Sequence, residues 1–281
     1  MPELPEVETI RRQLEPAVTG ARLSAIEVLD PRWCEPLAAD ALADAVRGRH
    51  VLALRRRGKY LDWVLEGELH LLMHLRMTGS LLLDADPGQR YVRVRLDFDS
   101  GRRLEFVDPR RFGTGQLLAG DSALEEFFGA RLGVEPFDEA FTAVVLRSLA
   151  RGKRVAVKTF LLDQRMIAGV GNIYADEALF RTRVHPLRAA GALRPNDYAL
   201  LRDSVREVLS MGIDSRGASI DDFRHLDGAR GSFQDRFRVH RREGEPCVVC
   251  GTTISKIVVG GRGTYFCAHC QPVPRIARAA R

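Results

Sequence analysis

Four cysteines near the end of the chain restrict its fold more than any other feature. Cys247-x2-Cys250 and Cys267-x2-Cys270 are two CxxC pairs with 16 residues between them. This spacing is typical of a four-thiolate zinc site, in which each pair supplies two ligands to one tetrahedral ion. Two redox-active CxxC motifs are the alternative, but redox chemistry requires neither this spacing nor a second pair. We therefore predict one Zn²⁺ ion that is structural and takes no part in catalysis.

The segment between the two cysteine pairs is expected to form a small ribbon. Ile254–Val259 and Thr264–Cys267 can pair as a hairpin, connected by the glycine-rich residues 260–264. These glycines would let the hairpin tip approach another surface closely, with Arg262 at the apex. A plain flexible turn explains the same residues equally well. His269 is expected to face solvent, because four sulfurs already complete the zinc shell.

The positive charge of the chain is concentrated at the same end. The formal net charge is +6, while residues 224–281 alone hold eleven Lys and Arg against four Asp and Glu. Such a distribution favours a nucleic-acid partner, although a solvated surface would also explain it. No apolar run is long enough to span a membrane, and the acidic N-terminus is unlike a secretory signal. We expect a cytoplasmic, monomeric protein.

The hydrophobic pattern predicts an α+β protein. Apolar residues recur at helical spacing from Leu4 to Leu14, and Pro16 is expected to end this helix. Short alternating segments broken by Gly, Asp or Pro then indicate a β-sandwich. These segments are residues 22–29, 49–56, 60–65, 69–75, 91–98, 103–107 and 114–118. Residues 1–130 should therefore form a β-sandwich domain with an N-terminal helix.

The second part of the chain is predicted to be helical. Candidate helices are Glu139–Leu149, Val157–Leu162, Tyr174–Arg181 and Asp197–Ser210, and a tight glycine turn interrupts the series at Gly169–Asn172. Residues 212–233 form a long loop, either disordered or functional. We place a helical domain at residues 131–235 and the ribbon at residues 236–281.

Motifs along nearly the whole chain resemble those of the formamidopyrimidine-DNA glycosylase family. The chain opens with MPELPEVET (residues 1–9), and RGKY (57–60) is similar to the family's catalytic-lysine segment. The two family loops that enter DNA resemble HLRMTG (74–79) and DPRRFG (108–113). Lys158 with GVGNIYA (169–175) resembles the helix-two-turn-helix, and residues 244–271 resemble the zinc ribbon. The resemblance implies the fold predicted above.

The resemblance also implies a bacterial-type DNA glycosylase and AP lyase of base excision repair. Its substrate would be damaged double-stranded DNA that carries oxidised purines, such as 8-oxoguanine and formamidopyrimidines, with strand cleavage by β,δ-elimination. Pro2 would be the nucleophile once Met1 is removed, because an α-amine has a pKa near 8, about two units below that of lysine. A helix start nearby lowers it further, and the amine can form a Schiff base with the sugar. Glu3 would protonate the ring oxygen.

Further residues are implied to hold the DNA. The resemblance implies that Lys59 and Arg262 are catalytic. It also implies a clamp on the phosphates around the lesion, formed by Lys59, Lys158, Asn172 and Arg262. Met77, Arg110 and Phe112 resemble the wedge that fills the gap left by the flipped nucleotide. His74, in the same segment as Met77, is a further expected DNA contact.

Two positions depart from the family pattern. Arg76 stands where members often have glycine, and we expect little effect from it. In the lesion-loop segment Gly231-Ser232-Phe233, members often carry a larger middle residue. The family resemblance therefore says least about how this loop behaves.

Two other functions are alternatives. The sister glycosylase of the endonuclease VIII type, which prefers oxidised pyrimidines, shares Pro2, Glu3, the lysine and the ribbon. Residues 4–9 and Asp108–Gly113 favour the purine-cutting branch instead. A zinc-ribbon DNA-binding protein without catalysis would explain the charge and the cysteines, but not the N-terminal motif.

Overall fold

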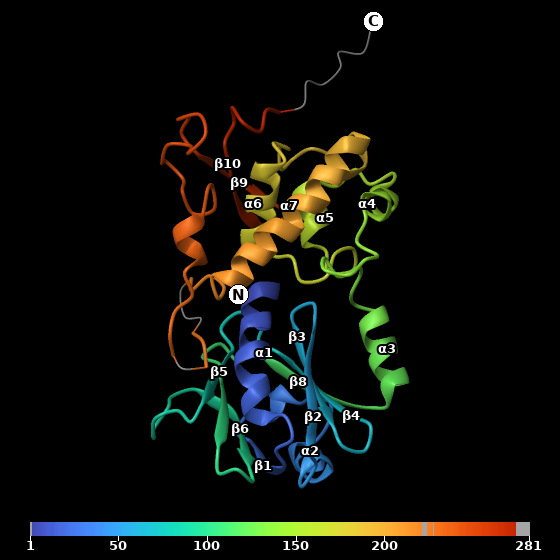
Figure 1. Cartoon of the computed structure of the whole chain (residues 1–281), viewed down its shortest axis with the longest axis vertical. Coiled ribbons are helices and arrows are strands. Elements are labelled where there is room, and N and C mark those ends of the chain that lie inside the picture. The colour runs from blue at the N-terminus through green and yellow to red at the C-terminus, as the bar shows by residue number, and fades with distance from the viewer. Residues whose placement is uncertain (1, 221–223, 227, 274–281) are drawn as a thin grey trace, which may run out of the picture. The chain divides into compact units, whose positions relative to one another are not determined.

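The structure, a computed structural model, describes residues 2–220, 224–226 and 228–273 (Figure 1). The chain forms two compact units. The first comprises the residues up to Arg131 together with Gly212–Gln234, and the second comprises Leu132–Met211 and the residues from Asp235 onward. Within the described ranges, no helix is long and apolar enough to cross a membrane.

The first unit is built on two antiparallel four-stranded sheets. One has the order β1-β6-β7-β5, from Leu23–Val28, Val92–Phe98, Arg103–Val107 and Ser80–Leu83. The other has the order β2-β3-β4-β8, from Val51–Arg57, Tyr60–Leu65, Leu69–His74 and Thr114–Ala119. Buried side chains of both sheets, among them Trp63 and Phe106, belong to one apolar cluster. The predicted β-sandwich within an α+β fold is confirmed.

Helix α1, Leu4–Val18, packs along β2 and β3 (Figure 1). It does not end at Pro16 as expected, but continues to Val18, whose side chain is fully buried. Pro16 lies in the last turn, where its missing N–H removes one helical hydrogen bond. Burial of a valine side chain contributes about 1.5 kcal/mol or more, which offsets this loss.

Two further helices complete the first unit. They are α2, Ala39–Val46, which lies against β1, and α3, Asp121–Gly129, which follows β8. Neither helix is among the elements predicted from the sequence, and the short strand β5 is also additional to them.

The segment Gly212–Gln234 packs with the first unit, although we expected it inside the helical domain at residues 131–235. The Leu226 side chain belongs to the sandwich core, and its carbonyl accepts a hydrogen bond from Leu83 N at 3.3 Å. Ala218 N donates to Glu6 Oε1 at 2.7 Å. These contacts link residues far apart in sequence, which local pattern does not reveal. Residues 221–223 and 227 of the predicted loop lie outside the described residues.

The second unit combines helices with a two-stranded ribbon. The helices are α4 (Ala143–Ala150), α5 (Val157–Leu162), α6 (Asn172–Arg181) and the part of α7 (Pro195–Asp214) up to Met211. Thr142 caps α4, because its Oγ1 accepts from Val145 N at 3.2 Å. Strands β9 (Ser255–Val259) and β10 (Arg262–Phe266) pair antiparallel, and α6 packs against both α5 and β10.

Candidate active site and metal centre

The N-terminal residues Pro2 and Glu3 are fixed at the start of α1. Glu3 is the N-cap and forms a capping box: its side chain accepts from the backbone of Glu6, and Glu6 Oε2 accepts from Glu3 N at 2.8 Å. Both Pro2 and Glu3 are buried. The structure therefore places a carboxyl group next to Pro2 at the positive end of a helix dipole. Met1 lies outside the described residues.

Glu6 connects this helix start to the segment Gly212–Gln234. Its two carboxylate oxygens accept from Glu3 N and Ala218 N, and the side chain is only 2% exposed. Gly217 has φ +75° next to it, and a Cβ there would lie 2.9 Å from Glu6 Cγ. The family resemblance implies a role for Glu6 at the active site, although a glutamate in the first turn of a helix also suits the helix dipole. Its position indicates that it holds the chain around the helix start.

Lys59 lies in the tight turn between β2 and β3, where it is 5% exposed. Gly58 adopts φ +57°, which favours glycine, and Arg56 Nη1 donates to the Gly58 carbonyl at 3.2 Å. The turn thus holds Lys59 directly before Tyr60, the first residue of β3.

His74 pairs with Tyr60 across the sheet, with ring centroids 4.5 Å apart. Its Nδ1 accepts from Arg76 N at 2.9 Å, so a neutral ring carries its proton on Nε2. Burial, followed by the charges of Arg76 and Lys59, lowers the pKa of His74 to about 3. His74 is therefore a neutral hydrogen-bond donor at ordinary pH.

The predicted wedge residues stand at the surface of the first unit. Met77 is 38% and Phe112 48% exposed, and the Arg110 guanidinium lies 4.9 Å from the Phe112 ring centroid. This brings Arg110 and Phe112 together as a cation–π pair.

Asp108, to which the sequence analysis assigned no role of its own, forms hydrogen bonds to both loops that carry the predicted wedge residues, 74–79 and 108–113. We call these two segments the wedge loops. Its fully buried carboxylate accepts from Thr78 Oγ1 at 2.5 Å and from the backbone N–H groups of Arg110, Phe112 and Gly113 at 2.7–3.1 Å. The Asp108 carboxylate thus links Thr78, which follows Met77, to the loop that carries Arg110 and Phe112. An aspartate that precedes a proline and a turn was the available signal in the sequence.

Two non-glycine residues in these loops adopt left-handed backbone conformations. They are Arg76, with φ +54°, and Arg111, with φ +60°. Arg111 is held by a bidentate ion pair with Asp30, at 2.6 and 2.8 Å, which lowers the pKa of the Asp30 carboxyl far below its usual range. The left-handed backbone at Arg76 favours glycine, the residue that the family resemblance leads us to expect at this position. It also replaces our expectation of little effect at this position with an expected cost in stability.

Lys158, for which the sequence predicts a phosphate contact, packs inside the second unit. It is 0% exposed, and its Nζ contacts Asp176 Oδ1 at 2.7 Å, Thr264 Oγ1 at 2.8 Å and the Gly263 carbonyl at 3.0 Å. Two of these contacts, to Thr264 and Gly263, are hydrogen bonds, and the contact with Asp176 is an ion pair. Lys158 therefore supports the ribbon hairpin.

Asn172 contacts the same carbonyl, with Nδ2 3.0 Å from Gly263 O. It is also the first residue of α6, where backbone N–H groups and the helix dipole favour an anion. Arg262, the neighbour of Gly263, is exposed at the start of β10. Lys158 and Asn172 together fix the hairpin next to Arg262.

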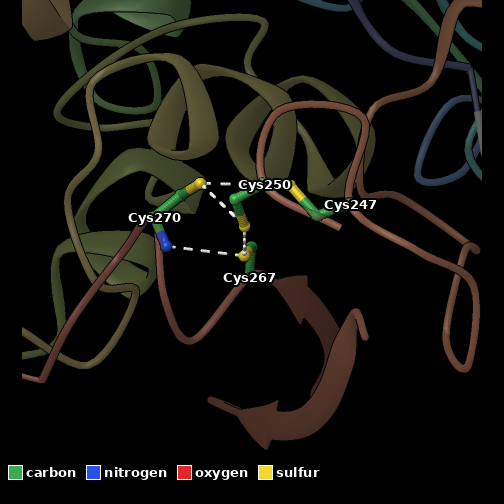
Figure 2. A group of neighbouring side chains, drawn as sticks. All are labelled: Cys247, Cys250, Cys267 and Cys270. Carbon is green, nitrogen blue, oxygen red and sulfur yellow. Dashed lines mark hydrogen bonds between the residues drawn. The ribbon is translucent and has the colours of Figure 1, made fainter. Parts of the chain in front are cut away.

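The four predicted zinc ligands converge at the other end of the ribbon (Figure 2). Their sulfur atoms all lie within 4.8 Å of one another, and three Sγ–Sγ distances are 3.5, 3.5 and 3.9 Å. A tetrahedral zinc ion with Zn–S bonds of about 2.3 Å requires sulfur separations of about 3.8 Å. All four cysteines are free of disulfides, so the group fits one structural Zn²⁺, as predicted.

Comparisons with known proteins agree with this arrangement. Three family models match the chain: the formamidopyrimidine-DNA glycosylase N-terminal domain over residues 1–115, its H2TH domain over 132–224, and the zinc finger found in FPG and IleRS over 244–273. The formamidopyrimidine-DNA glycosylase of Roseiflexus sp. (strain RS-1) is 44% identical and that of Pelotomaculum thermopropionicum 42%. These alignments cover 96% and 97% of this chain, respectively, and 100% of each relative.

Solved structures are also similar. A mutant of the Lactococcus lactis FPG, in complex with a Fapy-dG containing DNA, has a TM-score of 0.91 at 36% identity, covering 97% of this chain and 100% of that chain. The MutM (FPG) protein from Thermus thermophilus has a TM-score of 0.87 at 42% identity, covering 96% and 98%. With family models along most of its length and relatives matched end to end, the chain belongs to the formamidopyrimidine-DNA glycosylase family.

Proposed function

We propose that this chain is a bifunctional DNA glycosylase and AP lyase that removes oxidised purines, including 8-oxoguanine and formamidopyrimidines, from duplex DNA. The observation that carries the proposal is the position of Pro2 and Glu3 at the start of α1, with Glu3 held in a capping box. A helix N-terminus lowers the pKa of a nearby amine, and a neutral amine is the reactive form.

In this proposal the Pro2 amine, freed by removal of Met1, attacks C1′ of the damaged nucleotide. Glu3 gives a proton to the ring oxygen as the sugar opens, the base departs, and an iminium joins Pro2 to the sugar. Elimination of the 3′ and then the 5′ phosphate cuts the strand. Because Glu3 follows Pro2 directly, its carboxyl group lies close to the sugar that Pro2 attacks, and the proton has only a short distance to travel to the ring oxygen.

Each unit would bring its own contacts to the DNA. In residues 1–130, the catalytic domain, Lys59 and the neutral His74 Nε2–H would bind phosphates, while Met77 and the Arg110–Phe112 pair would occupy the gap left by the flipped base. In the second unit, Asn172 and Arg262 would bind phosphates, with Lys158 as the support of the hairpin. The ribbon at residues 236–281 would owe its shape to zinc. The substrate implies a place at the bacterial nucleoid, in the cytoplasm.

Borohydride trapping tests the covalent step, because borohydride reduces an iminium to a stable amine. The protein, with Met1 removal verified by mass, is incubated with a duplex carrying 8-oxoguanine. We expect one cross-linked species, weaker trapping for Pro2→Gly, and none after acetylation of the N-terminus. Glu15→Gln, a change of a half-exposed glutamate on the same helix, should trap like the wild type. Undiminished trapping with Met1 still attached would overturn Pro2 as nucleophile.

The lesion preference requires a second assay. Release of 8-oxoguanine is compared with release of thymine glycol under single-turnover conditions, with 8-oxoguanine expected to leave faster. The opposite order would favour the pyrimidine-cutting activity. DNA binding without trapping on either substrate would favour a binding protein without catalysis.

A further inference from the structure

Arg56 lies in β2, three residues before Lys59, and its side chain bonds to the turn that carries this lysine. Arg56 Nη1 donates to the Gly58 carbonyl at 3.2 Å. This carbonyl belongs to the peptide group that joins Gly58 to Lys59. The hydrogen bond therefore orients the backbone directly before Lys59.

The same guanidinium also reaches helix α1. Arg56 Nε donates to Glu8 Oε2 at 3.0 Å, and the two side chains are only 11% and 10% exposed. At this degree of burial, salt screens an ion pair much less than it screens a pair at the surface. A single arginine thus links α1 to the turn of Lys59.

Glu8 is itself held in place by two arginines of its own helix. Arg11 Nη2 and Arg12 Nε lie 2.9 and 2.8 Å from Glu8 Oε1. Burial raises the pKa of Glu8, but hydrogen bonds from Arg11 and Arg12 outweigh burial, so the pKa lies below its ordinary value. Glu8 is therefore ionised at neutral pH, and its carboxylate has a fixed place on the helix.

Helix α1 carries the proposed nucleophile at its start. Glu3 is the N-cap, and Glu8 follows five residues later, which is about 7.5 Å along the axis at the usual helical rise. The connection from Pro2 to Lys59 thus runs through one turn and a half of helix, one ion pair and one hydrogen bond.

We propose that Arg56 and Glu8 are positioning residues for excision, because they set the place of Lys59 relative to Pro2. This rests on the proposed function, in which Lys59 and Pro2 both act at the damaged nucleotide. Arg56 and Glu8 touch neither the DNA nor the reacting atoms, and act through Lys59. Such a role matters for the rate, since a shift of about 1 Å in a group at the site can slow a reaction about 100-fold.

A double-mutant cycle separates this role from a general effect on stability, because residues that act through one another have non-additive effects. The measured quantity is the single-turnover rate of 8-oxoguanine excision at saturating enzyme. Arg56→Gln should lower this rate roughly 10- to 100-fold. Lys59→Gln should also be slow, and adding Arg56→Gln to it should cause little further loss.

Two more variants complete the cycle. Glu8→Gln keeps an oxygen that accepts from Arg56, so it should slow excision less, with the same dependence on Lys59. Arg95→Gln is the matched control: Arg95 pairs with Glu105 at 3.1 Å in the other sheet of this unit, and its loss should leave the rate unchanged. Urea unfolding verifies that each variant is folded in the assay. If Arg56→Gln is not, Glu8→Gln decides by the same comparison.

Three results would overturn the positioning role while the wild type excises 8-oxoguanine. They are a wild-type rate in Arg56→Gln or in Lys59→Gln, independent losses from these two changes, and an equal loss in Arg95→Gln. Absence of excision by the wild type would instead overturn the proposed function, and this role with it.

Discussion

Lys158 and Asp176 form an ion pair in which both side chains are fully buried, with 2.7 Å between Nζ and Oδ1. The other Asp176 oxygen lies 2.8 Å from His240 Nδ1, and Lys158 also donates to Gly263 O and Thr264 Oγ1. A buried ion pair adds little net stability compared with apolar packing, but removal of one partner is costly. Its main consequence is therefore positional: it ties α5 and α6 to the hairpin that carries Arg262.

Lys158→Met should loosen this part of the second unit. The change leaves Asp176 buried beside a neutral side chain, at a cost of about 3–5 kcal/mol. Hydrogen exchange of the backbone amides in α5, α6 and β10 should accelerate, while exchange in the β-sandwich should not change. A Lys158→Met Asp176→Leu double variant should lose less than the single one. Wild-type exchange in Lys158→Met would refute this role.

Arg76→Gly should stabilise the first unit. The left-handed conformation costs a non-glycine residue about 1–2 kcal/mol, and glycine avoids this cost but loses more entropy on folding. We expect a net gain of roughly 1 kcal/mol. Trp33 and Trp63, both in the sandwich core, report on urea unfolding by fluorescence. Arg76→Ala removes the same charge and keeps the strain, so a similar gain there would show that charge, not backbone strain, is responsible.

His74 should make the stability of the first unit depend on pH. Its folded pKa of about 3 lies below the ordinary value of 6.5, so the unfolded chain binds the extra proton between these values. The stabilisation is complete above pH 6.5 and is lost as pH falls toward 3, by on the order of 1 kcal/mol per pH unit. Urea unfolding at pH 4.5 and 7.5 should show a smaller difference for His74→Gln than for the wild type. Equal differences would contradict a buried neutral His74.

Elements with a strong periodic pattern were predictable from the sequence. The ranges 60–65, 103–107 and Val157–Leu162 agree with β3, β7 and α5 residue for residue. The unexpected elements lack such a pattern. Helix α2 is short and buries only Leu42 and Val46, and α3 buries only Phe127. In such elements, packing against the rest of the unit determines the structure more than local spacing does.

The candidate site was predictable where local chemistry is distinctive. The four cysteines are recognisable by their spacing, and Pro2 and Glu3 by their position directly before a predicted helix. The contact of Lys158 with Asp176 was not predictable, because a lysine in a helix has the same local sequence whether it faces solvent or a buried carboxylate. The role of Asp108 depends on contacts between separate loops, which a single sequence does not reveal.

Zinc should hold the ribbon and, through it, Arg262. Cys267→Ser should lose both metal and DNA affinity, because metal binding supplies folding energy to so small a ribbon. Arg262→Ala should keep its zinc, measured by metal analysis, and bind DNA with a salt slope shallower by about one unit. A chelated, metal-free wild type that binds DNA normally would contradict this coupling.

Arg110 should discriminate the base opposite the lesion. Its backbone N–H is held by Asp108, and its exposed side chain places a planar fork of donors over the Phe112 ring. Cytosine offers two acceptors, O2 and N3, to such a fork. Adenine offers one ring nitrogen beside an amino group that would face the guanidinium unfavourably. Excision of 8-oxoguanine should therefore be faster opposite cytosine than opposite adenine, by roughly 1–3 kcal/mol in activation free energy.

The measurement is single-turnover excision on both duplexes. Arg110→Ala should abolish the preference. Arg110→Lys keeps the charge but loses the planar fork, so it should retain binding and lose most of the discrimination. Excision opposite adenine would convert a replication error into a permanent mutation, so such a preference suits a repair enzyme. Equal wild-type rates on the two duplexes, or an unchanged ratio in Arg110→Ala, would exclude Arg110 as the residue that recognises the opposite base.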